Sequence, residues 1–131
     1  MSAQPVRRCR ILILDDEPII ALDIESILLD AGYEIATVTG RIATALAVID
    51  SGACDAAVLD ANLSGESAAP VAAAMIARGL PFIVLSGYAK EQLPEILRAA
   101  PSLEKPTNAM LLVDRLGSIV GPHGVLHPAA A

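Results

Sequence analysis

Three aspartates, one serine and one lysine each follow a short strand-like segment, and these residue types could carry metal and phosphoryl chemistry. Asp15 and Asp16 follow the apolar run ILIL, and Asp60 follows AAVL. Ser86 follows FIVL, and Lys105 follows SLE. A short apolar run that ends in a carboxylate is typical of a buried strand whose last side chain faces solvent at the sheet edge. Because ligands bind at that edge in open parallel α/β sheets, we expect these side chains to converge there.

The chemistry of such a cluster follows from its charges. Neighbouring carboxylates repel one another, and a hard divalent cation relieves the repulsion, so oxygen ligands with open positions favour Mg²⁺. A carboxylate beside Mg²⁺ can attack a phosphoryl group and keep it as an acyl phosphate. Lys105 would then neutralise phosphoryl oxygens, Ser86 would donate a hydrogen bond to one, and Gly87 would let backbone come close. Each residue alone is more often an ordinary cap, turn or surface group, and their order on successive strand ends favours a functional site.

Alternating strands and helices are predicted to position these residues. Strands are expected at 10–14, 34–39, 56–60, 82–85 and 102–107. Helices are expected from Pro18 to a C-cap at Gly32 and at 41–51, 67–78, 94–100 and 108–120, with a polar loop after Asp60. Such alternation forces parallel pairing with right-handed crossovers, and therefore a three-layer α/β sandwich. We expect one folded domain over 9–120, with flexible ends at 1–8 and 121–131.

Composition limits the class of protein. The 131 residues suit one domain, and with 54% hydrophobic but only 2% aromatic residues the core must consist of Ala, Val, Leu and Ile. The net charge of −6 argues against a nucleic-acid surface. No apolar run approaches the roughly 20 residues of a membrane span, and the start has no signal-peptide core. Two cysteines form no disulfide framework, so we expect a reduced, cytoplasmic protein.

Four segments, ILILDDEP, VLDANLSGE, VLSGYA and EKPT, resemble the receiver domain of two-component response regulators. The resemblance extends over residues 10–120 and implies a flavodoxin-like (CheY-like) sheet with strand order 2-1-3-4-5. It implies that Asp60 is the phosphoacceptor. It also implies that Asp15 and Asp16 hold Mg²⁺ with Asp60, and that the backbone carbonyl of Asn62 is a further ligand.

The resemblance also assigns the switch. Ser86 matches the switch hydroxyl, and Lys105 matches the phosphate-binding lysine. Many receivers carry Tyr or Phe three residues before that lysine, where this chain has Ser102, so we expect Tyr88 to report the switch instead. The segments LPFIVLSGY and DANLSGE further resemble the "FAT GUY" subgroup of single-domain receivers, which is associated with alphaproteobacterial histidine kinases of the HWE and related type. Residues 84–86 are Val-Leu-Ser rather than the Phe-Ala-Thr of that motif.

The predicted function is a stand-alone receiver, not an enzyme, that a histidine kinase phosphorylates on Asp60. With about ten residues after the last helix, the expected output is a contact with a downstream protein or a phosphate sink. The principal alternative is a pseudo-receiver that binds partners without phosphorylation. A haloacid-dehalogenase-type phosphatase would need a second aspartate where Asn62 stands, and an FMN carrier would need a phosphate-cradling loop where DDEP stands.

Overall fold

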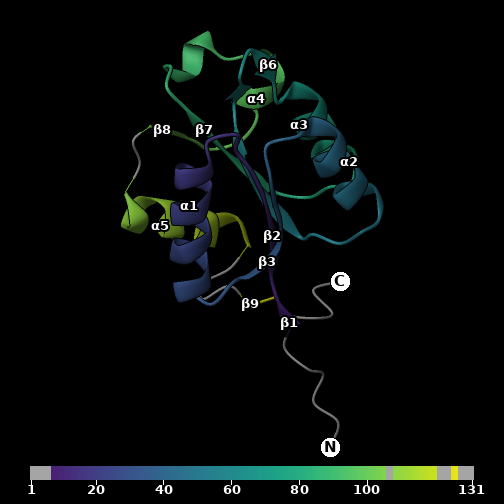
Figure 1. Cartoon of the computed structure of the whole chain (residues 1–131), viewed down its shortest axis with the longest axis vertical. Coiled ribbons are helices and arrows are strands. Elements are labelled where there is room, and N and C mark those ends of the chain that lie inside the picture. The colour runs from purple at the N-terminus through teal and green to yellow at the C-terminus, as the bar shows by residue number, and fades with distance from the viewer. Residues whose placement is uncertain (1–6, 106–107, 121–124, 127–131) are drawn as a thin grey trace, which may run out of the picture.

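A five-stranded parallel sheet forms the centre of the computed structural model, which describes residues 7–105, 108–120 and 125–126 (Figure 1). Its strands are β2 (Arg10–Leu14), β3 (Glu34–Thr39), β4 (Ala56–Asp60), β7 (Phe82–Ser86) and β8 (Ser102–Glu104). They lie in the order β3-β2-β4-β7-β8, and every neighbouring pair is parallel. Counted along the chain, this is the order 2-1-3-4-5, so the predicted flavodoxin-like fold is confirmed.

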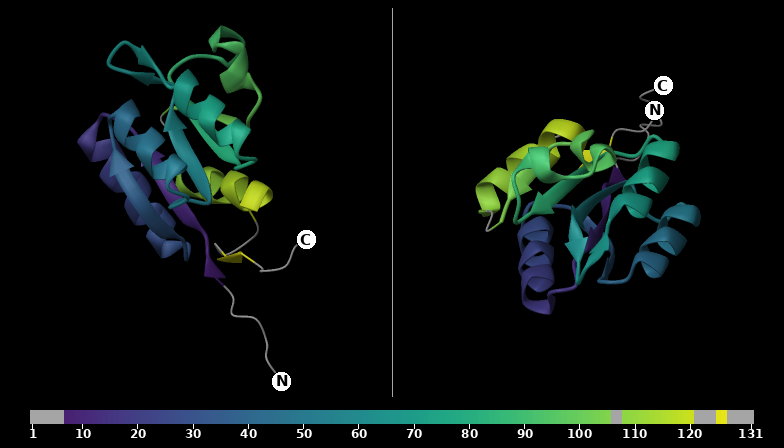
Figure 2. Two further views of the ribbon diagram at one scale, coloured as in Figure 1. Left: turned by 90° about the vertical axis from the view of Figure 1, so that its right-hand side faces the viewer. Right: turned by 90° about the horizontal axis from the view of Figure 1, so that it is seen from above.

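Helices cover both faces of the sheet (Figure 2). They are α1 (Pro18–Asp30), α2 (Ile42–Asp50), α3 (Ala69–Ala77), α4 (Glu95–Arg98) and α5 (Ala109–Val120). A 3-10 turn, η1 (Lys90–Gln92), and then Pro94 precede α4, which is a single turn, so the predicted helix at 94–100 is short as expected. Asn108 caps α5 by accepting the backbone N–H of Leu111 at 2.8 Å. Within the described residues, no helix could span a membrane.

The two faces of the sheet bury two separate apolar clusters. In β2, Ile11 and Ile13 face α1 and α5, whereas Leu12 and Leu14 face α2 and α3. Successive side chains of a strand point to opposite faces, so a sheet that is covered on both sides needs a continuous apolar run. Most buried residues are Ala, Val, Leu and Ile, as the composition predicts. This double burial fixes the register of the strands, and with it the places where their polar ends emerge.

A small hairpin replaces the loop that was predicted after Asp60. Its strands are β5 (Asn62–Leu63) and β6 (Glu66–Ser67), which pair antiparallel. The two residues between them, Ser64 and Gly65, have φ values of 50° and 93°. Positive φ at both central residues is the pattern of a type I′ turn, the preferred connection of tight hairpins. The dipeptide Ser-Gly is a turn signal that could have predicted the hairpin.

Two short segments that are far apart in the sequence form a second, two-stranded sheet. Strand β1 (Arg7–Arg8) pairs antiparallel with β9 (Val125–Leu126). The other residues of the predicted flexible ends, 1–8 and 121–131, lie outside the described residues. The flexibility of these ends therefore stays a prediction.

Candidate functional site

The polar residues at the ends of β2, β4 and β7 lie together at one edge of the sheet and are buried. The exposed fraction is 4% for Asp15, 5% for Asp60 and 2% for Ser86. The expectation that Asp60 faces solvent is therefore wrong. The side chain is covered because the ammonium group of Lys105 lies 3.1 Å from its Oδ2 atom and the carboxylates that follow β2 lie beside it.

Three carboxylates form the acidic part of the site. Asp15, Asp16 and Asp60 each offer an oxygen, and these oxygens lie within 4.8 Å of one another. Two of the side chains are oriented by backbone N–H groups of nearby residues. Oδ1 of Asp15 accepts from Glu17 at 2.9 Å, and Oδ1 of Asp60 accepts from Asn62 at 3.3 Å. A cluster of hard oxygen donors at this spacing fits a divalent cation such as Mg²⁺.

Lys105 supplies the positive charge of the site. Its Nζ atom lies 3.1 Å from Asp60, 3.4 Å from Asp15 and 3.8 Å from Glu17. Its backbone N–H donates to the carbonyl of Ser86 at 2.7 Å, which fixes the chain directly after β8. The sheet therefore holds this ammonium group against two buried carboxylates.

Burial and charge act in opposite directions on this ion pair. Burial raises the pKa of Asp60, and the hydrogen bond and charge of Lys105 offset only part of that rise. Burial lowers the pKa of Lys105, but the carboxylates of Asp60 and Asp15 outweigh it, so the pKa ends above its usual value. Lys105 therefore carries a positive charge in the site. A further cation beside Asp60 would stabilise the ionised form of its carboxylate against the cost of burial.

Ser86 is held by the loop that follows it. Its Oγ atom accepts the backbone N–H of Tyr88 at 2.9 Å, which leaves the hydroxyl hydrogen free to be donated elsewhere. The side chain of Tyr88 is 55% exposed. A Cβ atom on Gly87 would meet no protein atom within 4 Å, and the expected approach of its backbone to a phosphoryl group stays a prediction. Ser102 is the first residue of β8 and pairs with Val84. It stands at the position where many receivers carry Tyr or Phe.

Sequence reasoning missed three neighbours of the cluster. Glu17 reaches Lys105, as described above. Gly40 lies so close to Asp16 that a Cβ atom on it would stand 2.7 Å from the Asp16 Cα atom. Ser64, at the tip of the hairpin, donates its hydroxyl to Oδ2 of Asp16. The carbonyl of Asn62, proposed as a metal ligand by resemblance, stays a prediction.

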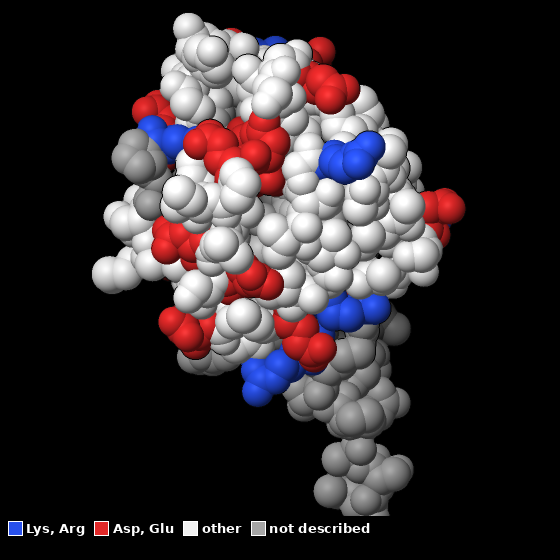
Figure 3. All heavy atoms as spheres, in the orientation of Figure 1, with Lys and Arg blue, Asp and Glu red and all other residues white. Residues whose placement is uncertain are grey.

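A groove that is open to solvent lies beside the acid pair, between α1 and the end of β3. This groove has a volume of about 520 Å³, and Leu22, Val38 and Arg41 line it together with Asp15 and Asp16. Acidic side chains gather on the side of the molecule where α1 lies (Figure 3).

Comparison with known proteins assigns the family. No family profile and no curated protein matches the chain. Among solved structures, SdrG from Sphingomonas melonis Fr1 is 34% identical, with a TM-score of 0.75 over 86% of this chain and 96% of SdrG. A response regulator receiver protein from Sinorhizobium medicae is 30% identical, with a TM-score of 0.72 over 86% of this chain and 94% of that one.

A third similar structure contains a bound ligand. The response regulator TrrA from Thermotoga maritima, in complex with Mg²⁺ and BeF, is 28% identical, with a TM-score of 0.75 over 85% of this chain and 98% of TrrA. The similarity extends over nearly the whole of each of these proteins. With the sheet order and the acidic edge described above, it shows that the chain belongs to the receiver-domain family of response regulators, the CheY-like proteins.

Proposed function

We propose that this receiver accepts a phosphoryl group on Asp60 from a histidine kinase and transmits the signal through a conformational switch. The observation that carries the proposal is the enclosure of Asp60 between two further carboxylates and one ammonium group. Such convergence of charge at the carboxyl edge of a parallel sheet is costly to stability and is typical of functional sites.

The oxygen donors of the cluster fit a resident Mg²⁺ ion. Asp15, Asp16 and Asp60 would hold it, with the backbone carbonyl of Asn62 as a further ligand. The bound ion supplies positive charge that neutralises phosphoryl oxygens. The similar TrrA structure, which contains Mg²⁺ and BeF, supports this assignment.

The chain's own residues account for the transfer step. A carboxylate oxygen of Asp60 forms a bond to phosphorus while the phosphorus–nitrogen bond of a phosphohistidine breaks. The electron pair stays on the imidazole nitrogen of the kinase, which takes a proton from water. Lys105, already 3.1 Å from Asp60, remains in place to pair with the new negative charge. The kinase is expected to be of the HWE or a related type.

Ser86 then acts as the switch. Its hydroxyl turns to donate to a phosphoryl oxygen and gives up the N–H of Tyr88, which it accepts at 2.9 Å in this structure. Release of that N–H frees the segment with η1 and the single-turn α4, so that the surface of β7, α4 and β8 rearranges. A Tyr88→Ala variant that keeps the full phosphorylation-dependent change in hydrogen exchange at residues 88–101 would exclude Tyr88 as the reporter.

The test is phosphorylation by a small donor. The purified protein is incubated with acetyl phosphate and Mg²⁺, and its intact mass is measured beside an Asp60→Asn variant. An Asp50→Asn variant is the matched control, because Asp50 is exposed at the end of α2 and pairs with Arg78 rather than with Lys105. We expect one phosphoryl adduct on the wild type and the control, and none on Asp60→Asn or without Mg²⁺. An adduct on Asp60→Asn would refute the assignment, and absence of any adduct, even with kinase, would favour a pseudo-receiver.

A further inference from the structure

Asp16 is held differently from the other two carboxylates of the cluster. Asp15 and Asp60 are each fixed by a backbone N–H two residues further along and by Lys105. Asp16 is only half-buried, and its carboxylate accepts the hydroxyl of Ser64. Its orientation therefore depends on a residue that belongs to a different element, the β5–β6 hairpin.

The turn of that hairpin presents the hydroxyl. Ser64 occupies the first central position of the turn with φ 50°, in the left-handed region that Gly, Asn and Asp prefer. The turn is braced from within, because Oδ1 of Asn62 accepts the N–H of Gly65 at 3.0 Å. Asn or Gly at position 64 would suit this backbone better, so the backbone alone does not account for a serine there. The contact of the Ser64 hydroxyl with Asp16 accounts for it.

We propose that Ser64 is a positioning residue for the metal site. Its hydroxyl keeps the Asp16 carboxylate turned toward Asp15 and Asp60, where all three can share one divalent cation. An aspartate at the protein surface otherwise samples several rotamers, and ordering it upon metal binding costs affinity. Hydrogen-bond partners of metal-ligating carboxylates commonly act in this way. This inference rests on the proposed function of the acidic cluster and adds the hairpin to it.

The experiment measures the affinity for Mg²⁺ directly, without phosphorylation. Backbone amide shifts of the full chain are followed by NMR as Mg²⁺ is added to the wild type, Ser64→Ala and Ser64→Gly. Both variants lack the hydroxyl, but only Ser64→Gly also relieves the left-handed backbone. We expect both to raise the Kd for Mg²⁺ about tenfold. Thermal unfolding without metal is expected to separate them, with Ser64→Gly the more stable.

Two further variants test whether the effect passes through Asp16. Ser67→Ala removes another hydroxyl of the same hairpin, one that accepts the N–H of Ala69 at 3.1 Å, and it should leave the Kd unchanged. In an Asp16→Asn background, Ser64→Ala should add no further loss.

The outcomes distinguish the role of Ser64 from the proposed function of the acidic cluster. Wild-type affinity in Ser64→Gly would overturn the positioning role while leaving the metal site intact. Absence of Mg²⁺ binding by the wild type would overturn the proposed function itself.

Discussion

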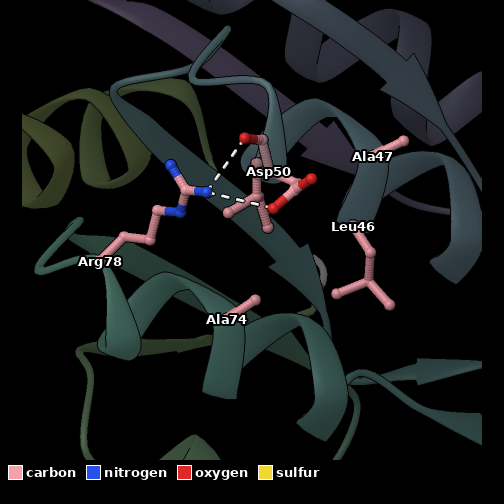
Figure 4. A pocket seen from close by; sticks show the side chains of 6 residues that line it. Leu46, Ala47, Asp50, Ala74 and Arg78 are labelled. Atoms are coloured by element: carbon pink, nitrogen blue, oxygen red, sulfur yellow. Dashed lines mark hydrogen bonds and ion pairs between the residues drawn. The ribbon is translucent and has the colours of Figure 1, made fainter.

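Two ion pairs of this molecule have the same length and opposite surroundings. Lys105 and Asp60 are 3.1 Å apart at the edge of the sheet, and Arg78 and Asp50 are 3.1 Å apart across the groove between α2 and α3 (Figure 4). The exposed fraction of the aspartate side chain is 6% in the first pair and 89% in the second. Distance alone therefore does not distinguish the pair at the candidate site from an ordinary surface pair, whereas burial does.

The chemistry of the two places follows from that difference. Asp50 stays hydrated, and the guanidinium of Arg78 divides its donors between the Asp50 carboxylate and the Asp50 backbone carbonyl. Such a pair gains little, because water already satisfies both charges. Asp60 has lost most of its water and depends on Lys105 and, in the proposed function, on a metal ion. Removing one partner should therefore have very different consequences at the two sites.

The largest expected effect is that of Lys105→Ala. Without the ammonium group, Asp15 and Asp60 are two buried carboxylates with no cation, and we expect the free energy of unfolding in EDTA to fall by about 2 kcal/mol. The loss should shrink as the pH falls, because Lys105 lowers the pKa of Asp60 and its removal lets that carboxyl take up a proton more readily. Urea unfolding at several pH values measures this effect.

The control for that experiment is Lys90→Ala, which removes an exposed lysine of η1. Mg²⁺ should restore more stability to Lys105→Ala than to the wild type, because the ion replaces the missing charge. Equal losses in the two lysine variants would mean that the buried contact of Lys105 with Asp60 stabilises the fold no more than an exposed lysine does.

A second prediction tests how rigidly the backbone holds the buried site. In Gly40→Ala the new Cβ atom would stand 2.7 Å from the Asp16 Cα atom and 3.3 Å from the Asp15 carbonyl oxygen. Both are backbone atoms and cannot move cheaply, so we expect a loss of about 1–2 kcal/mol in the free energy of unfolding. The Kd for Mg²⁺ should rise as well, because Asp16 is displaced.

Gly87→Ala is the matched control for this substitution, since its Cβ atom would meet nothing within 4 Å. Its cost in stability should stay within about 0.5 kcal/mol. If Gly40→Ala changed the free energy of unfolding as little as Gly87→Ala, the close packing of the loop after β3 would not be needed to position the acid pair.

The sequence predicts the residues of the buried cluster better than it predicts the neighbouring residues that hold them in position. Apolar runs of strand length predict β2, β4 and β7, and the polar residue at the end of each run predicts the position of the candidate site. Both predictions succeed because strand-length apolar runs are local signals. The contacts of Gly40 and Ser64 with Asp16 could not be predicted in this way. They join loops that are distant in the chain, and only the assembled sheet brings those loops together.

The same limit explains the error about Asp60. A strand-end carboxylate faces solvent unless other elements cover it, and Lys105, which covers it, comes from the far end of the chain. The Ser-Gly dipeptide at 64–65 did carry a local signal, that of a tight hairpin turn. Composition, by contrast, predicted the aliphatic core well, because so few aromatic residues were available to fill it.

A third ion pair, Arg10 with Asp55, is intermediate in burial between the two pairs compared above. Arg10 and Asp55 have side chains that are 34% and 12% exposed, and they meet through two parallel contacts of 3.0 Å and 3.1 Å. Arg10→Lys keeps the charge but loses the planar fork, and it also loses the bond to the carbonyl of Gly52. We expect a loss of about 1 kcal/mol in urea unfolding. An unchanged midpoint would show that partial burial does not strengthen a pair.

The smallest effect is expected at the surface pair. Arg78→Ala removes the hydrogen bonds to Asp50, but the aspartate stays hydrated, and the change in the free energy of unfolding should be within about 0.5 kcal/mol. Its aliphatic stem lines the groove with Leu46 and Ala74, so Arg78→Met keeps that packing and isolates the charge. Both variants should be phosphorylated at the wild-type rate. A loss above 1 kcal/mol in Arg78→Met that vanishes at high salt would show that an exposed pair here stabilises the fold as the buried one does, and burial would then no longer distinguish the two sites.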